Sequence, residues 1–405
     1  MPKILQITVD GNAGSTGRIA ESIGLIAIDS GWQSYIAHAI HPRESASKII
    51  KIGCKFDLIL HALKTRFFDA HGFGSKRATK KLIKQLKSIN PDVILLHHLH
   101  GYYINIQVLF EYLSQISTPI VWVFHDCWSF TGHCTHYDFV GCEKWKNECG
   151  KCPQKREYPA SLFLDRSKYN FRLKKKLFTS VKNMTVVSVS KWLNDHVKLS
   201  FFNKYPNKVI YNGIDVDIFS PSNNNFSIRN IHKVGNKFLI LGVAGVWSKK
   251  KGLFDFIMLS NKLDDNFQII LIGLNKDQLK DLPKNIIGIP LTENLSELSD
   301  YYSAADVYVN LSVEETFGLT TAEALSCGTP AIVYNSTACP ELVDSETGII
   351  VEKNNIDDLV LAIEQVRKKG KSSYASSCRK RALNIFDKND RFLEYINLFE
   401  DLVKT

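Results

Sequence analysis

Two glutamates, Glu315 and Glu323, flank the start of a short helix that the sequence predicts over residues 321–326. An apolar run that predicts a buried strand ends just before them, and Thr320 and Thr321 are suitable helix N-caps. The free N–H groups and the dipole at a helix N-terminus bind phosphate esters, and carboxylates accept hydrogen bonds from sugar hydroxyls. This stretch therefore predicts a site for a sugar phosphate ester. A turn with two solvated glutamates is the alternative interpretation.

A glycine-rich turn near the N-terminus is a second candidate for anion binding. Residues 4–9 predict a strand, residues 18–30 predict a helix, and the segment from Gly11 to Gly17 holds three glycines. Glycines let the backbone approach an anion closely. The spacing differs from that of the dinucleotide motif GxGxxG, so we expect no nicotinamide cofactor. A tight turn with Arg18 in solvent is the alternative.

Histidines follow two predicted strands. Residues 91–96 predict a strand that leads into His97, His98 and His100, and residues 120–124 predict another that ends in His125 and Asp126. Ligands of open α/β sheets bind beyond the carboxyl ends of the strands. The first three histidines could bind a metal, but we favour a polar wall of a ligand site. A histidine that only caps local backbone is the alternative for His125.

Four cysteines lie close together in the middle of the chain: Cys134, Cys142, Cys149 and Cys152. Only the last pair has CxxC spacing, yet the cluster sits among Gly, Lys and Pro in a loop too polar to fold by burial. The pattern predicts a small structural zinc loop. Two disulfides, or a mixed set that uses His133 or His136, are the alternatives. A nucleic-acid-binding zinc knuckle is disfavoured because the loop interrupts an α/β domain.

Length and composition indicate a chain of two ordinary domains. The chain has 405 residues, a hydrophobic content of 44% and a net charge of +10 that is concentrated in its first half. The sequence shows neither a signal peptide nor an apolar run of the ~18 residues that span a bilayer, so we expect a cytoplasmic protein. The basic half, with an amphipathic lysine-rich helix at residues 75–88, suggests an anionic membrane surface or nucleic acid as partner. A solvated basic surface is the alternative.

Glu315, seven intervening residues, Glu323 and the following Ala-Leu-x-x-Gly-Thr-Pro resemble the donor-binding motif of retaining GT-B glycosyltransferases of the family 4 type. The segment HDCWSFTGHC and the cysteines after it resemble the subset that builds bacterial capsule, colanic-acid-like and other exopolysaccharides. The resemblance implies an α/β GT-B fold, with two Rossmann-like doubly wound domains facing a cleft.

The resemblance also implies the domain boundaries. An acceptor-side domain would span residues 1–222, with the Cys-rich loop at 127–153. A linker would follow at 223–236 and a nucleotide-sugar donor domain at 237–385. A helix at 386–405 would pack back toward the N-terminal domain.

Site residues are carried over from the family by position. Glu315, Lys251 and His125 would be the catalytic residues, Glu315 and His125 by contacting the transferred sugar and Lys251 by neutralising the donor diphosphate. The other donor-binding positions would be Gly14, Ser15, Arg18, Gly245, Lys250, Thr316, Phe317, Gly318, Leu319 and Glu323. Two departures from the family pattern stand out. Val246 and Trp247 occupy the place of an expected arginine, and Thr337 and Ala338 replace a glycine pair.

The implied function is transfer of a sugar, with retention of configuration, from a nucleotide diphosphate sugar to a saccharide acceptor on a polyprenyl diphosphate. The family has no agreed protein nucleophile, and no DxD motif stands at a predicted sheet edge, so we expect no catalytic metal and no nucleic-acid partner. The alternatives are a GT-B nucleotide-sugar epimerase and a basic nucleic-acid-binding protein. The donor sugar, nucleotide, acceptor and linkage are not determined by these motifs.

Overall fold

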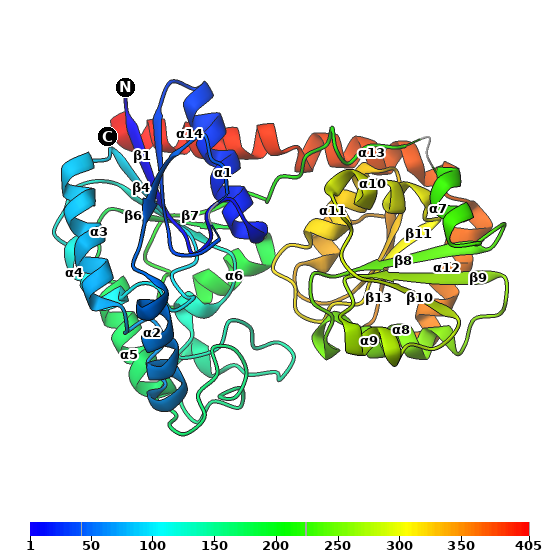
Figure 1. Ribbon diagram of the computed structural model, residues 1–405, viewed down its shortest axis with the longest axis horizontal. Coiled ribbons are helices and arrows are strands. Elements are labelled where there is room, and N and C mark those ends of the chain that lie inside the picture. The colour runs from blue at the N-terminus through cyan, green and yellow to red at the C-terminus, as the bar shows by residue number, and fades with distance from the viewer. Residues whose placement is uncertain (42, 223–224, 405) are drawn as a thin grey trace. The chain divides into compact units, whose positions relative to one another are not determined.

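The computed structural model describes residues 1–41, 43–222 and 225–404. The chain divides into two compact units (Figure 1). Unit 1 comprises Met1–Ile210 and Asn389–Thr405, and unit 2 comprises Tyr211–Lys388. Each unit contains one parallel sheet whose strands alternate with helices along the chain, which confirms the predicted Rossmann-like α/β fold class. Among the described residues, no helix is long and apolar enough to cross a membrane.

The sheet of unit 1 has seven parallel strands in the order β3-β2-β1-β4-β5-β6-β7. The strand order reverses between β1 and β4, which are neighbours in the sheet. The central strands are buried on both faces, as their continuous apolar sequences require. The strands are β1 (Lys3–Ile7), β2 (Gln33–His38), β3 (Lys48–Lys51), β4 (Val93–Leu96), β5 (Ile120–Phe124), β6 (Met184–Ser188) and β7 (Asn207–Val209).

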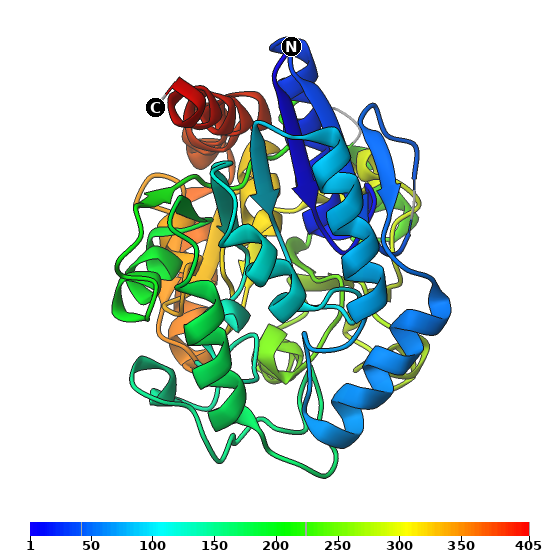
Figure 2. The ribbon, with the colours of Figure 1, turned by 90° about the vertical axis from the view of Figure 1, so that its left-hand side faces the viewer.

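Helices cover the sheet of unit 1, and α2 lies below the sheet in the view of Figure 1, beyond the ends of its strands (Figures 1 and 2). The C-terminal helix belongs to this unit, where Phe399 packs against Trp32 with ring centroids 6.0 Å apart. The α-helices are α1 (Gly14–Asp29), α2 (Lys55–Phe68), α3 (Lys76–Ile89), α4 (Ile106–Leu113), α5 (Ser167–Phe178), α6 (Lys191–Leu199) and α14 (Lys388–Lys404). Two 3-10 helices, η1 (Trp128–Phe130) and η2 (Lys144–Lys146), lie near the cysteine loop.

The sheet of unit 2 has six parallel strands in the order β10-β9-β8-β11-β12-β13, and its order reverses between β8 and β11. The strands are β8 (Phe238–Val243), β9 (Phe267–Ile272), β10 (Ile286–Ile289), β11 (Val307–Asn310), β12 (Ala331–Tyr334) and β13 (Gly348–Val351). The helices are α7 (Asn225–Ile231), η3 (Lys249–Lys251), α8 (Leu253–Ser260), α9 (Lys276–Lys280), α10 (Leu295–Ala304), α11 (Leu319–Ser326), η4 (Cys339–Leu342), α12 (Ile356–Lys369) and α13 (Ser372–Phe386).

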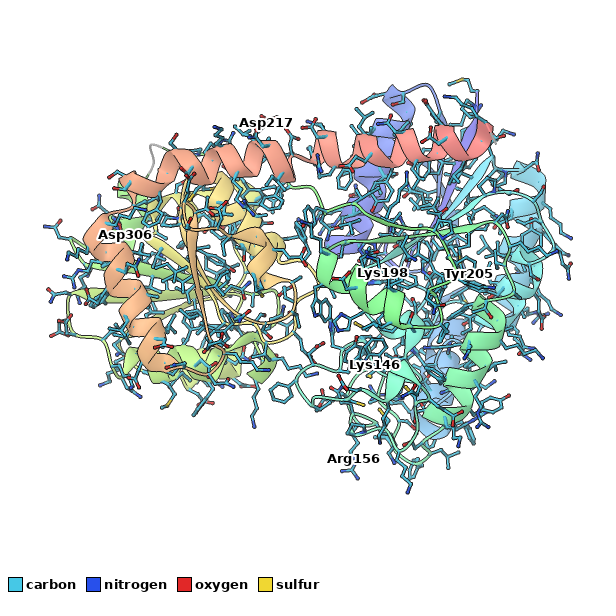
Figure 3. All side chains as sticks on the ribbon, turned by 180° about the vertical axis from the view of Figure 1, so that it is seen from behind. Lys146, Arg156, Lys198, Tyr205, Asp217 and Asp306 are labelled. Carbon is cyan, nitrogen blue, oxygen red and sulfur yellow. The ribbon has the colours of Figure 1, made fainter. Side chains whose placement is uncertain are left out.

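The segment predicted as a linker, residues 223–236, is not a plain connection. It contains helix α7, and its residues 223–224 lie outside the described part of the chain. The α7 side chain Arg229 binds Asp306 at 2.6 Å. Asp306, labelled in Figure 3, lies just before β11. Helix α7 therefore belongs to unit 2, to which this ion pair attaches it.

The chain also enters unit 2 earlier than residue 223. Phe219 is buried and packs against Tyr302 with ring centroids 6.0 Å apart, and Ile214 donates a backbone hydrogen bond to Phe386 at 2.8 Å. These contacts tie residues 211–222 to unit 2, so the observed boundary follows Ile210.

Candidate functional site

The site with the strongest chemical signal lies in unit 2, at the carboxyl ends of β8 and β11. The order of the sheet reverses between these two strands, and open α/β sheets bind ligands at such a position. Lys251 follows β8 and Glu315 follows β11, and the Lys251 ammonium lies 2.5 Å from the Glu315 carboxylate. Val313 donates a backbone hydrogen bond to Lys250 at 2.9 Å, which holds the two loops together. The structure thus joins two residues that the sequence separates by 64 positions.

Gly252 makes this approach of the two loops possible. Its φ is +77°, and a Cβ atom built on it would lie 2.4 Å from the Cβ of Leu311. A larger residue would therefore push the lysine loop away from the glutamate loop.

The charges of the site are balanced in pairs. Burial alone would lower the pKa of Lys251, but the Glu315 carboxylate together with the nearby Glu314 and Cys339 raises it, so Lys251 stays protonated. The neighbouring Lys250 pairs with the buried Glu314 at 2.8 Å. Lys251 therefore faces the carboxylate predicted to bind the donor sugar, whereas Lys250 balances a different, buried carboxylate.

The helix after Glu315 begins earlier than predicted. Helix α11 starts at Leu319 with Gly318 as N-cap, so the prediction that Thr320 and Thr321 cap it was wrong. The reason is the φ of +104° at Gly318, which turns the chain into the helix without a side-chain cap. The two threonine hydroxyls instead bond to other side chains of the unit, Tyr308 at 2.7 Å and Asn310 at 3.1 Å. The first turn of α11, with its free N–H groups, therefore starts only four residues after Glu315.

Both glutamates act electrostatically on the buried Tyr308. Burial raises the pKa of Tyr308, and the charges of both Glu315 and Glu323 raise it further. The Tyr302 hydroxyl donates to Glu323 at 2.9 Å, which orients that carboxylate. Phe317, by contrast, points into the core against Phe386 and contributes only its backbone.

The loop in which Thr337 and Ala338 replace the usual glycine pair holds the backbone of Glu315 by hydrogen bonds. Thr337 adopts a φ of +50°, and its hydroxyl accepts a hydrogen bond from the Glu315 backbone N–H at 2.9 Å. The N–H of Ala338 donates to the Glu315 carbonyl at 3.2 Å. The sequence showed only that the usual glycines are missing. The role of the two replacements was missed, because nothing in the pattern connects them to Glu315.

Gly245, the remaining predicted residue of this unit, is exposed in the turn after β8, with open space around its Cα. Trp247, which stands near the expected arginine, is buried against Phe256 and donates to the Ile272 carbonyl at 2.8 Å. Val246, the other residue at that place, is 75% exposed, and neither side chain carries a charge.

The predicted residues of unit 1 lie at the equivalent edge of its sheet. Helix α1 begins at Gly14, four residues earlier than predicted, so the glycine-rich segment forms its first turn. Gly14, Ser15 and Arg18 are exposed there. The Thr16 hydroxyl bonds His98 at 3.2 Å, which links the segments after β1 and β4 where the strand order reverses.

His125 belongs to a chain of buried side chains. One of its ring nitrogens lies 3.0 Å from His97, whose other ring nitrogen lies 3.0 Å from the Gln6 side chain. Burial lowers the pKa of His97 to about 3 and moves the pKa of His125 well below its usual value. Both imidazoles are therefore neutral at pH 7 and suited to hydrogen bonding.

Asp126 and its partners are functional candidates whose arrangement the sequence did not reveal. Its carboxylate lies 2.6 Å from His100 and 3.5 Å from His98. Among the described residues, these three side chains are the one set of His, Cys, Asp or Glu donors close enough together to hold a metal ion. His100 also contacts the Tyr158 hydroxyl at 3.1 Å. The polar wall of a ligand site stays a prediction.

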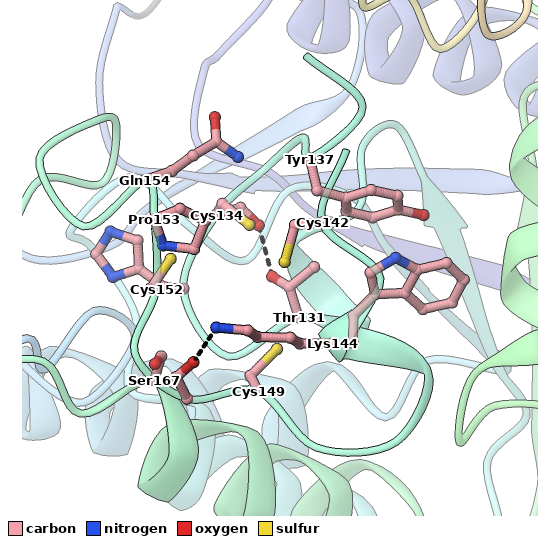
Figure 4. A pocket seen from close by; sticks show the side chains of 13 residues that line it. Thr131, Cys134, Tyr137, Cys142, Lys144, Cys149, Cys152, Pro153, Gln154 and Ser167 are labelled. Carbon is pink, nitrogen blue, oxygen red and sulfur yellow. Dashed lines mark hydrogen bonds between the residues drawn. The ribbon is translucent and has the colours of Figure 1, made fainter. Parts of the chain in front are cut away.

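The four cysteines line one small pocket in unit 1 (Figure 4). All four are free thiols, and Cys134 is buried. Among the described residues, no three donor atoms of these cysteines and their neighbouring histidines lie within 4.8 Å of one another, so a shared ion would require side-chain rotations.

Comparisons with known proteins agree with the geometry of both units. Residues 32–218 match the family model described as Glycosyltransferase Family 4, and residues 224–384 match the model described as Glycosyl transferases group 1. The second match contains Lys251, Glu315 and Glu323.

The chain is a GT-B glycosyltransferase of the family 4 type.

One relative of this glycosyltransferase matches nearly the whole chain and another matches about half of it. The putative colanic acid biosynthesis glycosyl transferase WcaC of Escherichia coli (strain K12) is 23% identical, over 98% of this chain and 100% of its own. The UDP-Gal:alpha-D-GlcNAc-diphosphoundecaprenol alpha-1,3-galactosyltransferase of Escherichia coli is 26% identical, over 56% of this chain and 67% of its own.

Solved structures show the same fold as this glycosyltransferase. Sucrose-phosphate synthase from Thermosynechococcus elongatus superimposes with a TM-score of 0.72 at 16% identity, covering 99% of both chains. HepE from Anabaena, in complex with UDP, superimposes with a TM-score of 0.68 at 16% identity, covering 99% of this chain and 100% of its own.

Proposed function

We propose that this glycosyltransferase moves a sugar from a nucleotide diphosphate sugar to a saccharide acceptor, with retention of anomeric configuration. The observation that carries the proposal is the pairing of Lys251 with Glu315 where the strand order of unit 2 reverses, next to the N-terminus of α11. A protonated amine, free N–H groups and a carboxylate are the chemical partners of a diphosphate joined to a sugar.

Each group has a role in donor binding. Lys251 and the first turn of α11 contact the diphosphate, Glu315 accepts hydrogen bonds from hydroxyls of the donor sugar, and Glu323 accepts from the ribose. Lys250, paired with Glu314, adds positive potential near the diphosphate without a direct contact. The UDP named in the structure of HepE supports a nucleotide ligand for this fold.

In the reaction, the bond between the anomeric carbon and the diphosphate oxygen breaks, and a bond to the acceptor oxygen forms on the same face. Negative charge develops on the departing diphosphate, and Lys251 stabilises it at short range. The departing phosphate takes the proton of the acceptor hydroxyl, so no side chain is assigned as nucleophile. Rate enhancement then comes from positioning and charge stabilisation.

The segments of unit 1 that follow β1, β4 and β5 supply the acceptor side. Gly14, Ser15 and Arg18 are exposed and serve the donor phosphates as well as the acceptor, and the neutral His125 hydrogen-bonds a hydroxyl of the transferred sugar. We infer an acceptor on a polyprenyl diphosphate, in the synthesis of a bacterial surface polysaccharide. The names of the two Escherichia coli relatives support this class of substrate. Such an acceptor also places the enzyme at the inner face of the plasma membrane.

The test is turnover with a nucleotide sugar selected by thermal-shift screening of UDP-, GDP- and ADP-sugars. Glu315→Gln should reduce transfer at least a hundredfold, whereas Glu346→Gln, an exposed glutamate outside the site, should leave it unchanged. NMR of the product should show the anomeric configuration of the donor. Conversion of the nucleotide sugar without any acceptor would favour an epimerase instead, and full activity of Glu315→Gln would refute the site.

A further inference from the structure

The cysteine pocket has the composition of a metal site. Cys134, Cys142, Cys149 and Cys152 all reach it from a loop with little regular structure (Figure 4). One side of the loop is packed, since Trp145 stacks on Tyr137 with ring centroids 4.9 Å apart. The four cysteines line the same pocket as this aromatic pair, together with Pro153. Cys142, Cys149 and Cys152 are only partly buried.

His133 adds a second observation at the same pocket. Its Nδ1 lies 2.7 Å from the buried Asp69 carboxylate, and its Nε2 is buried without a hydrogen-bond partner. A histidine that ligates a metal through one nitrogen typically bonds a carboxylate through the other. The N–H of Gly132 also donates to the Cys149 sulfur at 3.2 Å, a contact that stabilises a thiolate.

We propose that this pocket binds one zinc ion. Thiolate and imidazole donors favour zinc, and tetrahedral coordination needs four of the five donors present. Cys134, Cys149 and Cys152 provide three, and either Cys142 or His133 provides the fourth. The ion stabilises the loop next to β5 and takes no part in the transfer reaction. Its binding therefore does not depend on the proposed function.

The test is elemental analysis of the full-length protein, purified under reducing conditions without chelator. We expect one zinc ion per chain, lost in Cys149→Ser and in Cys152→Ser, but kept in Cys54→Ser, which removes an exposed thiol elsewhere. Cys142→Ser and His133→Gln identify the fourth ligand, because only the true ligand lowers the zinc content. Wild-type protein with no more zinc than Cys149→Ser would overturn the proposal.

A separate observation concerns helix α2, whose apolar side faces solvent. Six large side chains are between 44% and 65% exposed: Phe56, Ile59, Leu60, Leu63, Phe67 and Phe68. Most of them follow the spacing of one helix face, which in a soluble domain normally turns inward. A contiguous exposed apolar face of this kind marks an interaction site.

The buried side of α2 is polar, so the helix cannot simply turn over. His61 and Thr65 are its buried residues. The backbone N–H groups of Gly72 and Gly74 both donate to His61 Nε2 at 3.1 Å. These bonds fix the orientation of the helix, and they hold the apolar face outward.

A neighbouring loop enlarges the apolar face. Leu162, Phe163 and Leu164 are at least 46% exposed, and Phe163 stacks on Phe67 with ring centroids 5.5 Å apart. Leu162 donates a backbone hydrogen bond to Arg66 at 2.8 Å, which attaches the loop to the end of α2. We call the exposed apolar side chains of α2 and of residues 162–164 the α2 surface.

We infer that the α2 surface docks on an anionic lipid bilayer. Lys55, Lys64 and Arg66 are exposed around it, while Asp57 is engaged at the start of the helix with the Cys54 N–H at 2.9 Å. Apolar side chains with flanking basic residues bind the interface of anionic membranes. In a dimer through this surface, the same positive charges would face each other. The lysine-rich helix α3 is a weaker candidate, because Leu82 and Leu86 on its apolar side are buried.

Vesicle sedimentation of the full-length protein tests this inference. We expect binding to vesicles of phosphatidylglycerol and phosphatidylcholine, and much weaker binding to phosphatidylcholine alone. Ile59→Ser with Leu63→Ser should weaken binding about tenfold or more, because two side chains no longer enter the bilayer. Leu25→Ser with Leu199→Ser, which changes two other exposed leucines of unit 1, is the matched control.

Two outcomes would overturn the inference. One is equal binding by wild type and by the Ile59→Ser, Leu63→Ser variant. The other is a concentration-dependent dimer that this variant abolishes, which would make the α2 surface an interface between copies. Nucleotide-sugar binding should be unchanged in the variant, so failure of membrane docking is distinguishable from failure of the proposed function.

Discussion

At the scale of single residues, the ion pair of Lys251 and Glu315 holds both charged groups in position before any ligand binds. Glu315 keeps Lys251 protonated despite burial, and the Thr337 hydroxyl fixes the backbone of Glu315. Preorganised charges of this kind stabilise a developing anion without the cost of rearrangement. The geometry of the pair therefore depends on neighbours that do not contact the donor.

Thr337→Ala tests this dependence. The variant loses one hydrogen bond to the Glu315 backbone, worth about 1 kcal/mol, so the KM for the nucleotide sugar should rise about fivefold. The melting temperature should fall by only about 2–4 °C. Thr337→Ser should restore the wild-type KM. An unchanged KM in Thr337→Ala would show that the hydrogen bond from the Glu315 N–H to Thr337 does not position Glu315.

At the scale of elements, two loops and one helix N-terminus meet because β8 and β11 are neighbours at the reversal of the strand order. The loop after β8 approaches β11 closely only because residue 252 is a glycine. The site is thus a property of the sheet topology, refined by one backbone position.

Gly252→Ala should disrupt this arrangement. The added methyl group meets Leu311 and the φ of +77° becomes unfavourable, so the free energy of unfolding should fall by about 2 kcal/mol or more. Donor binding should weaken in parallel. Gly245→Ala in the same loop has open space and should keep wild-type stability, as chemical denaturation can show. Equal stability of Gly252→Ala and wild type would contradict the account.

The sequence predicted elements well where local pattern and tertiary packing agree. The strands before His97 and His125 appeared close to their observed ends because apolar runs mark buried strands. The start of α11 was misplaced, because positive φ at Gly318 is not visible in a pattern of N-cap residues. Helix α7 was missed because its position depends on the ion pair between Arg229 and Asp306, which lie far apart in the sequence.

The site was predictable to the level of its motif but not of its contacts. Glu315 and Lys251 came from a resemblance, and their pairing required the fold. The same holds for Asp126, whose role emerges only when two strand ends bring His98 and His100 beside it. Residues far apart in the sequence meet through sheet order, which periodicity does not encode.

At the scale of the whole molecule, unit 1 buries an unusual set of neutral histidines. Burial lowers the pKa of His61 to about 4 and the pKa values of His97 and His98 to about 3. The unfolded chain binds these protons near pH 6.5, whereas the folded chain does not. Acid therefore favours the unfolded chain, and the stabilising contribution of these residues is complete only above that pH.

The melting temperature should consequently fall as the pH drops below about 6.5 and should level off above it. His61→Gln removes one of the protons taken up on unfolding and should make the fall less steep. Differential scanning calorimetry at several pH values measures both slopes. A melting temperature that does not change between neutral and mildly acidic pH would contradict the assignment of neutral buried imidazoles.

The most direct test of the central claim is calorimetric titration of the protein with UDP, GDP and ADP. The Lys251–Glu315 site predicts that at least one of these diphosphates binds. Lys251→Ala should weaken that binding about tenfold or more, because a charge-assisted contact to phosphate is lost. Lys249→Ala, which removes an exposed lysine from the same turn, should bind like the wild type. Wild-type affinity in Lys251→Ala, or an equal loss in Lys249→Ala, would show that the diphosphate lies elsewhere.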